Sequence, residues 1–373
     1  MSSRKIAFLC SSTSWGGLEM NVLRFALWMK EAGQQTSLWC VENSPLHVEV
    51  KKSGLDCFPI KKHKKYFDLK AAKVLAKAFD KHQIDVVWIR DTRDMSVCGM
   101  AKSATKRELK LVYQQAMQLG VKKKDFFHTL RFKRIDLWVS PLQFLSDQVQ
   151  QMTRFPKEGN AVIPLALETN RFTQKKNQAE LREKTGIPVD ALVLGIIGRI
   201  DPLKGQDFLI RCHAESFKSH SNLHLVIVGE PTKDEGTDYY DALIELTKTL
   251  NTEHSVHFLP FQSDVENAYA LFDVFAMTSV GETFGMVTIE AMVSGLAIVG
   301  TNTSGTPELL EYGHAGLLYE PNDETQFNAC LEQLLTNPEM RAELGSIAQR
   351  SAIDRFSHGK VIQRLLTAIG DLY

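Results

Sequence analysis

The chain alternates short apolar runs with longer segments in which apolar residues recur every three to four positions. Continuous short runs are typical of strands buried on both faces of a parallel sheet, and the longer segments are typical of amphipathic helices. The predicted strands are Ile6–Cys10, Ser37–Val41, Val86–Ile89, Leu111–Tyr113, Leu137–Ser140, Ala161–Pro164, Leu192–Ile197, Leu223–Val228, Val256–Leu259, Val274–Met277 and Ala297–Gly300. The predicted helices include Leu18–Ala32, Leu69–Lys81, Gln206–Lys218, Tyr239–Asn251, Phe284–Val293 and Gln326–Asn337. This rhythm predicts βαβ units, in which helices join parallel strands.

The length of 373 residues predicts two domains, because a single hydrophobic core stops growing at about 250–300 residues. We expect the first domain to span residues 1–165 and the second to span residues 166–352, with the junction inside the segment 154–173. Each should be a Rossmann-like α/β domain with a doubly wound parallel sheet. Ligands of such sheets bind beyond the carboxyl ends of the strands, so a cleft between the domains is the expected site.

The composition is that of a folded protein without a membrane span. The chain is 44% hydrophobic and 24% charged, and no apolar run approaches the ~20 residues that cross a bilayer. The first apolar run is too short for a signal peptide and lacks a cleavage site of small residues, so we expect a cytoplasmic protein. The six cysteines are scattered without metal-ligand spacing and are expected to be reduced thiols.

A formal net charge of zero conceals two halves of opposite charge. Residues 1–165 contain 28 Lys and Arg against 15 Asp and Glu, a balance of +13, which leaves −13 for residues 166–373. Basic clusters lie at 61–65, 122–124 and 131–134. Such an excess favours an anionic partner, either a phosphorylated glycan or glycolipid or the inner face of an anionic cytoplasmic membrane. A solvated surface is the alternative for each cluster, and no nucleic-acid-binding motif accompanies the charge.

A glycine-containing loop with two cations follows the predicted strand Leu192–Ile197. It reads Gly198-Arg199-Ile200-Asp201-Pro202-Leu203-Lys204-Gly205. The planar guanidinium and the mobile ammonium can clamp a diphosphate, and the glycines let the backbone approach its oxygens. A surface turn with two unrelated charges is the alternative.

The segment from Gly281 to Gly295 (GETFGMVTIEAMVSG) holds two carboxylates around a predicted helix start. Free N–H groups at Phe284, Gly285 and Met286 would favour a phosphate, and Glu282 can accept hydrogen bonds from sugar hydroxyls. Glu290 lies among apolar helix residues, and a buried carboxylate needs partners such as a ribose diol. The alternative interpretation is that Glu282 only caps the helix and that Glu290 is exposed on the helix surface.

Two further loops lie at the expected carboxyl edges. Ser304-Gly305-Thr306-Pro307-Glu308 follows the strand Ala297–Gly300, and Gly16 and Gly17 follow the strand Ile6–Cys10 before a helix. The second loop lacks the GxGxxG spacing of a dinucleotide site. Its glycine pair and helix start suit the second phosphate of a donor or an incoming acceptor.

With these elements, the sequence resembles the retaining glycosyltransferases of family 4, the group-1 glycosyltransferases, which have the GT-B fold. The resemblance covers residues 160–360 and is carried by the array E-x-F-G-x-x-x-x-E-A-M-x-x-G together with these segments: Val162-Ile163-Pro164, Gly198-Arg199, Lys204-Gly205, Val226–Gly229, Gly305-Thr306-Pro307-Glu308 and Gly316-Leu317. It implies metal-independent, retaining sugar transfer from a nucleotide-sugar donor without a cofactor. The terminal stretch 353–373 looks like the last helix of the family, which packs back on the first domain.

The resemblance also implies roles for individual residues. Arg199 and Lys204 would bind the pyrophosphate, Glu282 the donor sugar and Glu290 the ribose. We therefore predict Glu282, Arg199 and Lys204 as catalytic residues. The predicted donor-binding residues are Gly16, Gly17, Gly198, Gly229, Thr283, Phe284, Gly285, Met286, Val287 and Glu290. No metal ligand is predicted.

The first half departs from the family at the acceptor side. Where many relatives have a histidine, this chain has Gln114 and Gln115, whose amides can position a sugar but cannot titrate. The usual Asn-Gly of the junction is absent at 165–168. Gln115, Lys123 and His128 are the predicted acceptor residues. The expected process is bacterial cell-surface polysaccharide or lipopolysaccharide synthesis; the alternatives are a sugar-nucleotide epimerase of the same architecture and a non-catalytic sugar-binding protein.

Overall fold

The computed structural model describes residues 3–231 and 236–373, which divide into two compact units. Unit 1 comprises the chain up to Pro164 together with His358–Tyr373, and unit 2 is Leu165–Ser357. The boundaries thus fall after residues 164 and 357, where the sequence-based prediction had placed them after residues 165 and 352.

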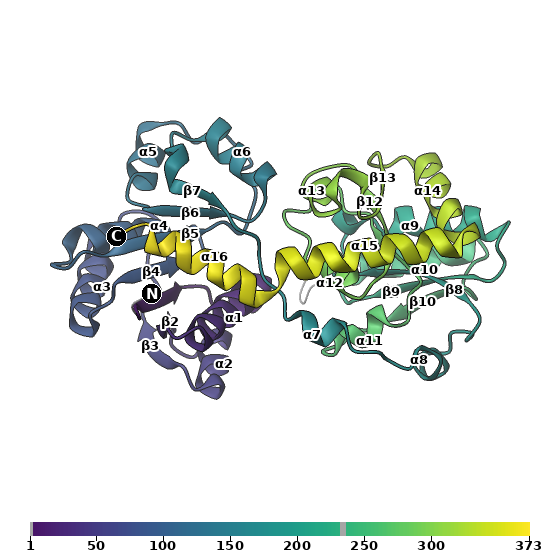
Figure 1. The fold of residues 1–373 in the computed structure, drawn as a ribbon, viewed down its shortest axis with the longest axis horizontal. Helices are drawn as coiled ribbons and strands as arrows, with labels where there is room; N and C mark the ends of the chain where they lie inside the picture. Colours follow the sequence, from purple (N-terminus) through teal and green to yellow (C-terminus); the bar gives the residue numbers. More distant parts are fainter. Residues whose placement is uncertain (1–2, 232–235) are drawn as a thin grey trace. The chain divides into compact units, whose positions relative to one another are not determined.

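Unit 1 contains a seven-stranded parallel sheet flanked by helices (Figure 1). Its strands are β1 (Lys5–Cys10), β2 (Gln35–Val41), β3 (Asp56–Ile60), β4 (Val86–Ile89), β5 (Lys110–Gln114), β6 (Leu137–Ser140) and β7 (Asn160–Val162). Its helices are α1 (Gly17–Glu31), α2 (Pro45–Ser53), α3 (Leu69–His82), α4 (Asp94–Ala104), α5 (Phe126–Phe132), α6 (Gln143–Met152), η1 (Lys157–Gly159) and α16 (His358–Gly370). The order β3-β2-β1-β4-β5-β6-β7 reverses between β1 and β4, so the carboxyl ends of these two strands flank the switch point of the sheet.

Both faces of this sheet are covered by apolar packing. On one face, the ring of Trp88 in β4 lies 5.6 Å from Phe8 in β1 and 6.2 Å from Phe25 in α1. On the other, Phe79 of α3 packs edge-on against Trp39 of β2 with 5.2 Å between ring centroids. Burial on both faces explains why these strands appear in the sequence as unbroken apolar runs.

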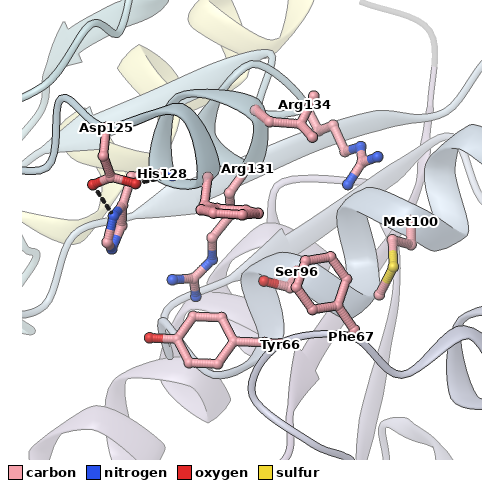
Figure 2. A pocket seen from close by; sticks show the side chains of 10 residues that line it. Tyr66, Phe67, Ser96, Met100, Asp125, His128, Arg131 and Arg134 are labelled. Atoms are coloured by element: carbon pink, nitrogen blue, oxygen red, sulfur yellow. Dashed lines mark hydrogen bonds and ion pairs between the residues drawn. The ribbon is translucent and has the colours of Figure 1, made fainter.

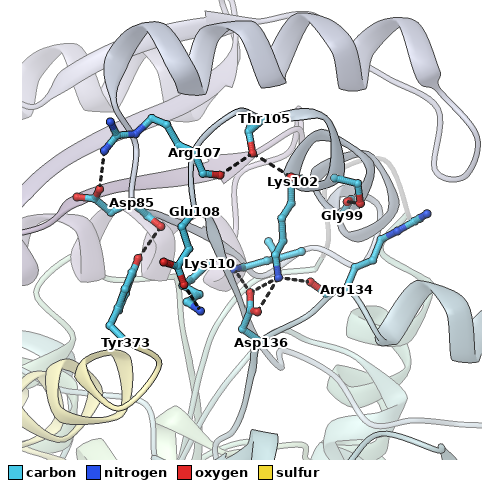
Figure 3. A network of polar contacts seen from close by, with 12 residues as sticks. Asp85, Gly99, Lys102, Thr105, Arg107, Glu108, Lys110, Arg134, Asp136 and Tyr373 are labelled. Atoms are coloured by element: carbon cyan, nitrogen blue, oxygen red, sulfur yellow. Dashed lines mark hydrogen bonds and ion pairs between the residues drawn. The ribbon is translucent and has the colours of Figure 1, made fainter.

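The end of the chain packs on unit 1. His358, the first residue of α16, stacks on Trp28 of α1 with 5.4 Å between ring centroids. The helix buries Val361, Ile362, Leu365 and Ile369, which share one face at helical spacing. The hydroxyl of Tyr373 donates a hydrogen bond to the carbonyl oxygen of Asp85 (2.9 Å), and the carboxylate of Asp85 pairs with Arg107 (Figure 3). The last residues of the chain thus take part in the packing of the first unit.

Unit 2 contains a six-stranded parallel sheet. Its strands are β8 (Leu192–Ile197), β9 (Leu223–Val228), β10 (Val256–Leu259), β11 (Val274–Met277), β12 (Ala297–Thr301) and β13 (Leu317–Tyr319). Its helices are α7 (Thr169–Phe172), α8 (Gln178–Thr185), η2 (Pro202–Lys204), α9 (Gln206–Phe217), α10 (Asp238–Thr249), α11 (Val265–Tyr269), α12 (Met286–Val293), α13 (Thr306–Leu309), η3 (Glu311–Gly313), α14 (Glu324–Thr336) and α15 (Pro338–Phe356). The order β10-β9-β8-β11-β12-β13 places the switch point between β8 and β11.

The prediction of a single terminal helix from residue 353 is wrong. α15 continues to Phe356, Ser357 leaves the helical conformation (φ −59°, ψ 133°), and α16 begins at the next residue. Phe356 is buried with its ring 6.1 Å from that of Phe284, and its carbonyl accepts a hydrogen bond from the N–H of Leu167 (2.9 Å). These tertiary contacts hold the end of α15 inside unit 2.

Candidate functional site

The predicted donor residues of the second half gather at the switch point of unit 2. β8 and β11 are neighbours in the sheet, and the loops after them carry Lys204 and Glu282. Because parallel strands end at the same edge, both loops emerge there side by side. The fold thus unites two motifs that lie 78 residues apart in the sequence.

The loop between β8 and α9 is fastened to the end of β11 by two buried hydroxyls. Thr278 Oγ1 donates to the carbonyl oxygen of Lys204 (2.6 Å), and Ser279 Oγ donates to that of Leu203 (3.1 Å). Gly205 has φ 71°, and a Cβ there would lie 2.9 Å from the carbonyl oxygen of Thr278. The sequence-based prediction missed Thr278 and Ser279, because hydroxyl residues after a strand are ordinary in turns.

The Lys204 ammonium and the Glu282 carboxylate form an ion pair, with Nζ 2.7 Å from Oε2. The two side chains are 28% and 17% exposed, so the pair is sheltered but accessible. An ammonium has three N–H groups and a carboxylate two oxygens, so each can hold the other and still bind a ligand. Arg199, on the same loop as Lys204, is 59% exposed and lies 3.3 Å from Asp201. This edge therefore offers two cations and a carboxylate.

The helix after β11 starts later than predicted. α12 begins at Met286, two residues after the predicted Phe284, because Gly285 (φ 84°) caps it in the left-handed conformation. The first N–H groups of the helix, on Met286 and Val287, therefore have no carbonyl within the helix to pair with. Phe284 is 5% exposed, so its ring belongs to the core and only its backbone is placed to meet a ligand. Thr283 is half-buried beside it.

Glu290, inside α12, is held by a residue that the sequence-based prediction missed. The hydroxyl of Tyr269 in α11 lies 2.9 Å from Oε2 of Glu290 and 3.0 Å from the carbonyl oxygen of Val287. Burial, followed by the charge of Glu290, raises the pKa of Tyr269 well above its usual value. The phenol thus stays protonated and serves as a donor. In the sequence it is indistinguishable from a core aromatic residue.

The structure explains why residue 229 is a glycine. Its φ is 153°, and a Cβ at this position would lie 1.9 Å from the carbonyl oxygen of Gly198. Only glycine therefore lets the loops that follow β8 and β9 approach each other this closely. Gly198 itself has room for a Cβ, whose nearest neighbours would be Lys204 side-chain atoms at 3.9 Å.

The glycine pair of unit 1 lies where predicted, after β1 at the start of α1. Gly16 caps the helix in an extended conformation, and a Cβ there would come 3.7 Å from Oε2 of Glu19. A Cβ on Gly17 would meet no described atom within 4 Å. Neither the backbone conformation nor the neighbouring atoms require glycine at these two positions. Because both side chains are missing, there is space beside the first turn of α1, a helix of 15 residues.

The strands β4 and β5 of unit 1 end in buried polar side chains. Arg90 is 3% exposed, and within residues 3–231 and 236–373 its Nε and Nη1 have no hydrogen-bond partner. Burial lowers its pKa to about 10. Gln114 is fully buried, and its amide is likewise unpaired within the described part of the chain. Gln115 is different, because its Oε1 accepts from Trp138 (3.0 Å) and Ser140 (3.2 Å). Its amide is thus engaged in holding unit 1 together.

The other two predicted acceptor residues lie near α5. His128 Nδ1 is 2.5 Å from Oδ2 of Asp125, and both residues line a surface cavity. Lys123 donates its backbone N–H to Met152 (2.7 Å). Burial lowers the pKa of Lys123, and the charge of nearby Arg131 adds to this effect. Gln115 is not among the residues that line the cavity.

Neither a metal cluster nor a membrane span is found in the described ranges. No three His, Cys, Asp or Glu side chains of residues 3–231 and 236–373 are placed to hold a metal ion. Over the same residues, no helix combines the length and apolarity needed to cross a bilayer.

Part of the second unit is similar to a family of known proteins. Residues 177–351 match the family model of the glycosyl transferases group 1. The D-inositol 3-phosphate glycosyltransferase of Stackebrandtia nassauensis is 35% identical over 216 residues, 56% of this chain and 48% of that protein. The enzyme of that name from Corynebacterium diphtheriae is 30% identical over 218 residues, 57% of this chain and 50% of that protein. The chain thus spans about half the length of the curated relatives it matches.

Solved structures match the whole chain in fold. The Anabaena protein Alr3699/HepE, in complex with UDP, has a TM-score of 0.85 at 22% identity, covering 98% of this chain and 100% of its own. A glycosyltransferase from Rickettsia africae has a TM-score of 0.88 at 18% identity, covering 100% of this chain and 99% of its own. The predicted GT-B fold, with two parallel-sheet α/β domains, is confirmed. Within this fold, residues 177–351 carry the pattern of the group 1 glycosyl transferases.

Proposed function

We propose that the protein transfers a sugar from a nucleotide-sugar donor to a glycan or glycolipid acceptor, with retention of the anomeric configuration and without a metal ion. The observation that carries this proposal is the ion pair between Lys204 and Glu282 at the switch point of unit 2. It joins a phosphate-binding cation to a sugar-binding carboxylate inside the segment that matches the family.

The donor is held by charges that meet at one edge of the sheet. Arg199 and Lys204 bind the diphosphate and stabilise the negative charge that grows on it as the glycosidic bond breaks. The free N–H groups at the start of α12 add a positive helix end. Glu282 accepts hydrogen bonds from the sugar, while Glu290, positioned by Tyr269, accepts those of the ribose.

The activities for which similar proteins are named support this class of reaction. The curated relatives are called D-inositol 3-phosphate glycosyltransferases, and HepE is described with UDP and with UDP-glucose. Two further structures with this fold are described as glycosyltransferases of lipopolysaccharide synthesis. UDP-sugars are therefore the first donors to test, and cell-surface polysaccharide or lipopolysaccharide synthesis is the proposed process.

The proposal is tested by incubating the full chain with a panel of nucleotide sugars and candidate acceptors. We expect a product heavier than the acceptor by one sugar, with the anomeric configuration of the donor by nuclear magnetic resonance. Transfer should persist in EDTA, because the two cations neutralise the diphosphate. Loss of transfer in EDTA that Mg²⁺ restores would refute metal independence, and an inverted product would refute retention.

Two other functions predict different outcomes for the same assay. An epimerase would convert a nucleotide sugar into its epimer without any acceptor. A non-catalytic sugar-binding protein would bind the donor but release no nucleotide diphosphate, and Glu282→Ala would leave cellular glycans unchanged. The carboxylate and cations around the proposed diphosphate site favour the transferase.

The basic character of unit 1 supports an anionic acceptor and peripheral contact with an anionic membrane. Its excess of Lys and Arg attracts negative charge over several ångströms, and salt screens this attraction. Sedimentation with vesicles tests the contact: binding should be stronger to anionic than to neutral vesicles and should weaken as salt is raised. Equal binding to both would refute membrane attraction by charge.

A further inference from the structure

A surface cavity of unit 1 lies outside the residues proposed to bind the donor. It has a volume of about 390 Å³ and is lined by three segments of the chain (Figure 2). These are the stretch before α3, the helix α4, and α5 with the residues beside it. The lining residues are Tyr66, Phe67, Ser96, Met100, Asp125, Phe127, His128, Leu130, Arg131 and Arg134. A cavity of this size suits a small molecule or part of a lipid.

The wall of the cavity is aromatic and aliphatic although it faces solvent. Phe67 is 73% exposed and Phe127 is 67% exposed. Tyr66 and Leu130, beside them, also remain exposed. Large apolar side chains that gather in a concave surface mark a binding site, because covering them removes apolar area from water. The ligand that fits this wall has an apolar part.

The side chain of Arg131 places a positive charge beside this aromatic wall. The guanidinium of Arg131 lies 5.4 Å from the centre of the Tyr66 ring, and Figure 2 shows it directed towards that ring. Its Nη2 donates to the carbonyl oxygen of Thr92, while its buried Nε has no hydrogen-bond partner among the described residues. A buried N–H without a partner is costly, and an anionic oxygen would satisfy it.

The wall of the cavity is richer in positive than in negative charge. Arg131 and Arg134 both line it, and Asp125 is the one acid among the lining residues. Asp125, the acid in the cavity wall, is already engaged: Oδ1 accepts from the backbone N–H of His128 (3.1 Å) and Oδ2 meets its ring (2.5 Å). An anionic ligand would balance the remaining positive charge.

We propose that this cavity binds an anionic amphiphile, with its hydrocarbon part against Tyr66, Phe67 and Phe127 and its phosphate or carboxylate at Arg131. The inference deepens the proposed function and rests on it in one respect, the assignment of this amphiphile as the acceptor or its lipid carrier. Binding itself is independent of transfer and is measured separately.

The binding test uses decyl phosphate below its micelle concentration, titrated into the full chain by calorimetry. Inorganic phosphate and decyl maltoside test each half of the ligand alone. Since a charge-assisted hydrogen bond and an aromatic contact each contribute more than ~1.4 kcal/mol, we expect either half alone to bind at least about tenfold more weakly. Decyl maltoside that binds as tightly as decyl phosphate would overturn the proposal.

Two matched pairs of variants separate the cavity from the general surface. Arg131→Gln and Phe127→Ser should each weaken decyl phosphate binding about tenfold or more. Lys133→Gln and Phe126→Ser lie beside these positions but outside the cavity wall, and should change binding less than about twofold. Phe126 is as exposed as Phe127, and Lys133 is more exposed than Arg131. Far-ultraviolet circular dichroism checks that all four variants fold. If Phe126→Ser weakens binding as much as Phe127→Ser, non-specific contact with exposed apolar side chains explains the data and the cavity assignment is refuted.

Transfer assays keep this inference distinct from the proposed function. Decyl phosphate should raise the apparent KM of the acceptor and leave that of the donor unchanged, and Phe127→Ser should raise only the former. If transfer proceeds and neither change occurs, the cavity is not the acceptor site although the transferase stands. If decyl phosphate binds as expected and no donor supports transfer, the result supports the cavity as a binding site and refutes the proposed function.

Discussion

Nζ of Lys204 lies 2.7 Å from Oε2 of Glu282, although the two residues belong to different βα loops 78 positions apart. The contact forms because β8 and β11 are adjacent parallel strands and because Thr278 and Ser279 fasten the first loop to the second strand. The groups proposed to bind the phosphate and the sugar of a donor are thus held in one geometry by the sheet itself.

Removing either member of this pair should impair transfer far more than stability. We expect Lys204→Ala and Glu282→Ala each to lower kcat/KM by about 10²–10³, because each removes a charge that acts on the donor. The free energy of unfolding should change by less than about 1 kcal/mol, because partly exposed pairs contribute little. Steady-state kinetics and urea unfolding measure the two effects. Lys218→Ala, which breaks the exposed pair with Glu215, is the control and should leave both unchanged; an equal loss of activity there would contradict the assignment.

Tyr269→Phe should weaken nucleotide binding without unfolding the protein. The change removes the hydroxyl that holds Glu290 and retains the buried ring. Because one hydrogen bond to a charged group contributes about 1.5–3 kcal/mol, we expect the Kd for UDP to rise about tenfold or more. Calorimetric titration with UDP and with uracil separates the ribose from the base. An unchanged Kd for UDP would show that Tyr269 does not position Glu290 for a ligand.

Gly229→Ala should destabilise unit 2. The added Cβ would fall 1.9 Å from the carbonyl oxygen of Gly198, and the backbone is already in a region that favours glycine (φ 153°). We expect a loss of about 1–3 kcal/mol in the free energy of unfolding, measured by urea denaturation. Gly359→Ala is the control, since a Cβ there meets no described atom within 4 Å. Equal stability of Gly229→Ala and the wild type would mean that the two loops separate easily.

Stability should decrease between pH 6.5 and 4 because of His213. Burial lowers its pKa to about 4, and the nearby His224, His254 and His257 add to that shift. Nε2 of His213 bonds to the carbonyl oxygen of Leu223 (3.1 Å), so protonation would charge the buried Nδ1. The unfolded chain takes up this proton below pH 6.5 and the folded chain only near pH 4, so stability is full above pH 6.5 and is lost as pH falls.

The size of this effect follows from the shift. A difference of about 2.5 pKa units corresponds to ~3 kcal/mol at pH 4. Urea unfolding of the wild type and of His213→Gln at several pH values measures it, and the variant should show a shallower decline between pH 6.5 and 4. Parallel curves for the two proteins would contradict this origin of the pH dependence.

Strands that form short, mostly apolar runs were predictable, whereas one edge strand of each sheet was missed. β8, β9, β10 and β11 have the predicted bounds, although β10 lies at the edge of its sheet. The edge strands β3 and β13 were missed. β3 (DCFPI) contains a proline, tolerated only where no neighbouring strand needs its N–H, and β13 (LLY) is three residues long. Both form because a neighbouring strand supplies the pairing, which local sequence does not show.

The sequence by itself determined which charged groups are available at the proposed donor site. Local sequence shows the charge of each candidate residue and its position after a predicted strand or within a predicted helix. These residues are Arg199, Lys204, Glu282 and Glu290. Only the tertiary structure decided which of them meet. The pairing of Lys204 with Glu282 and the support of Glu290 by Tyr269 join segments from different βα units. So does the cavity in which Arg131 lies over Tyr66, because such contacts depend on strand order and helix packing rather than on nearby residues.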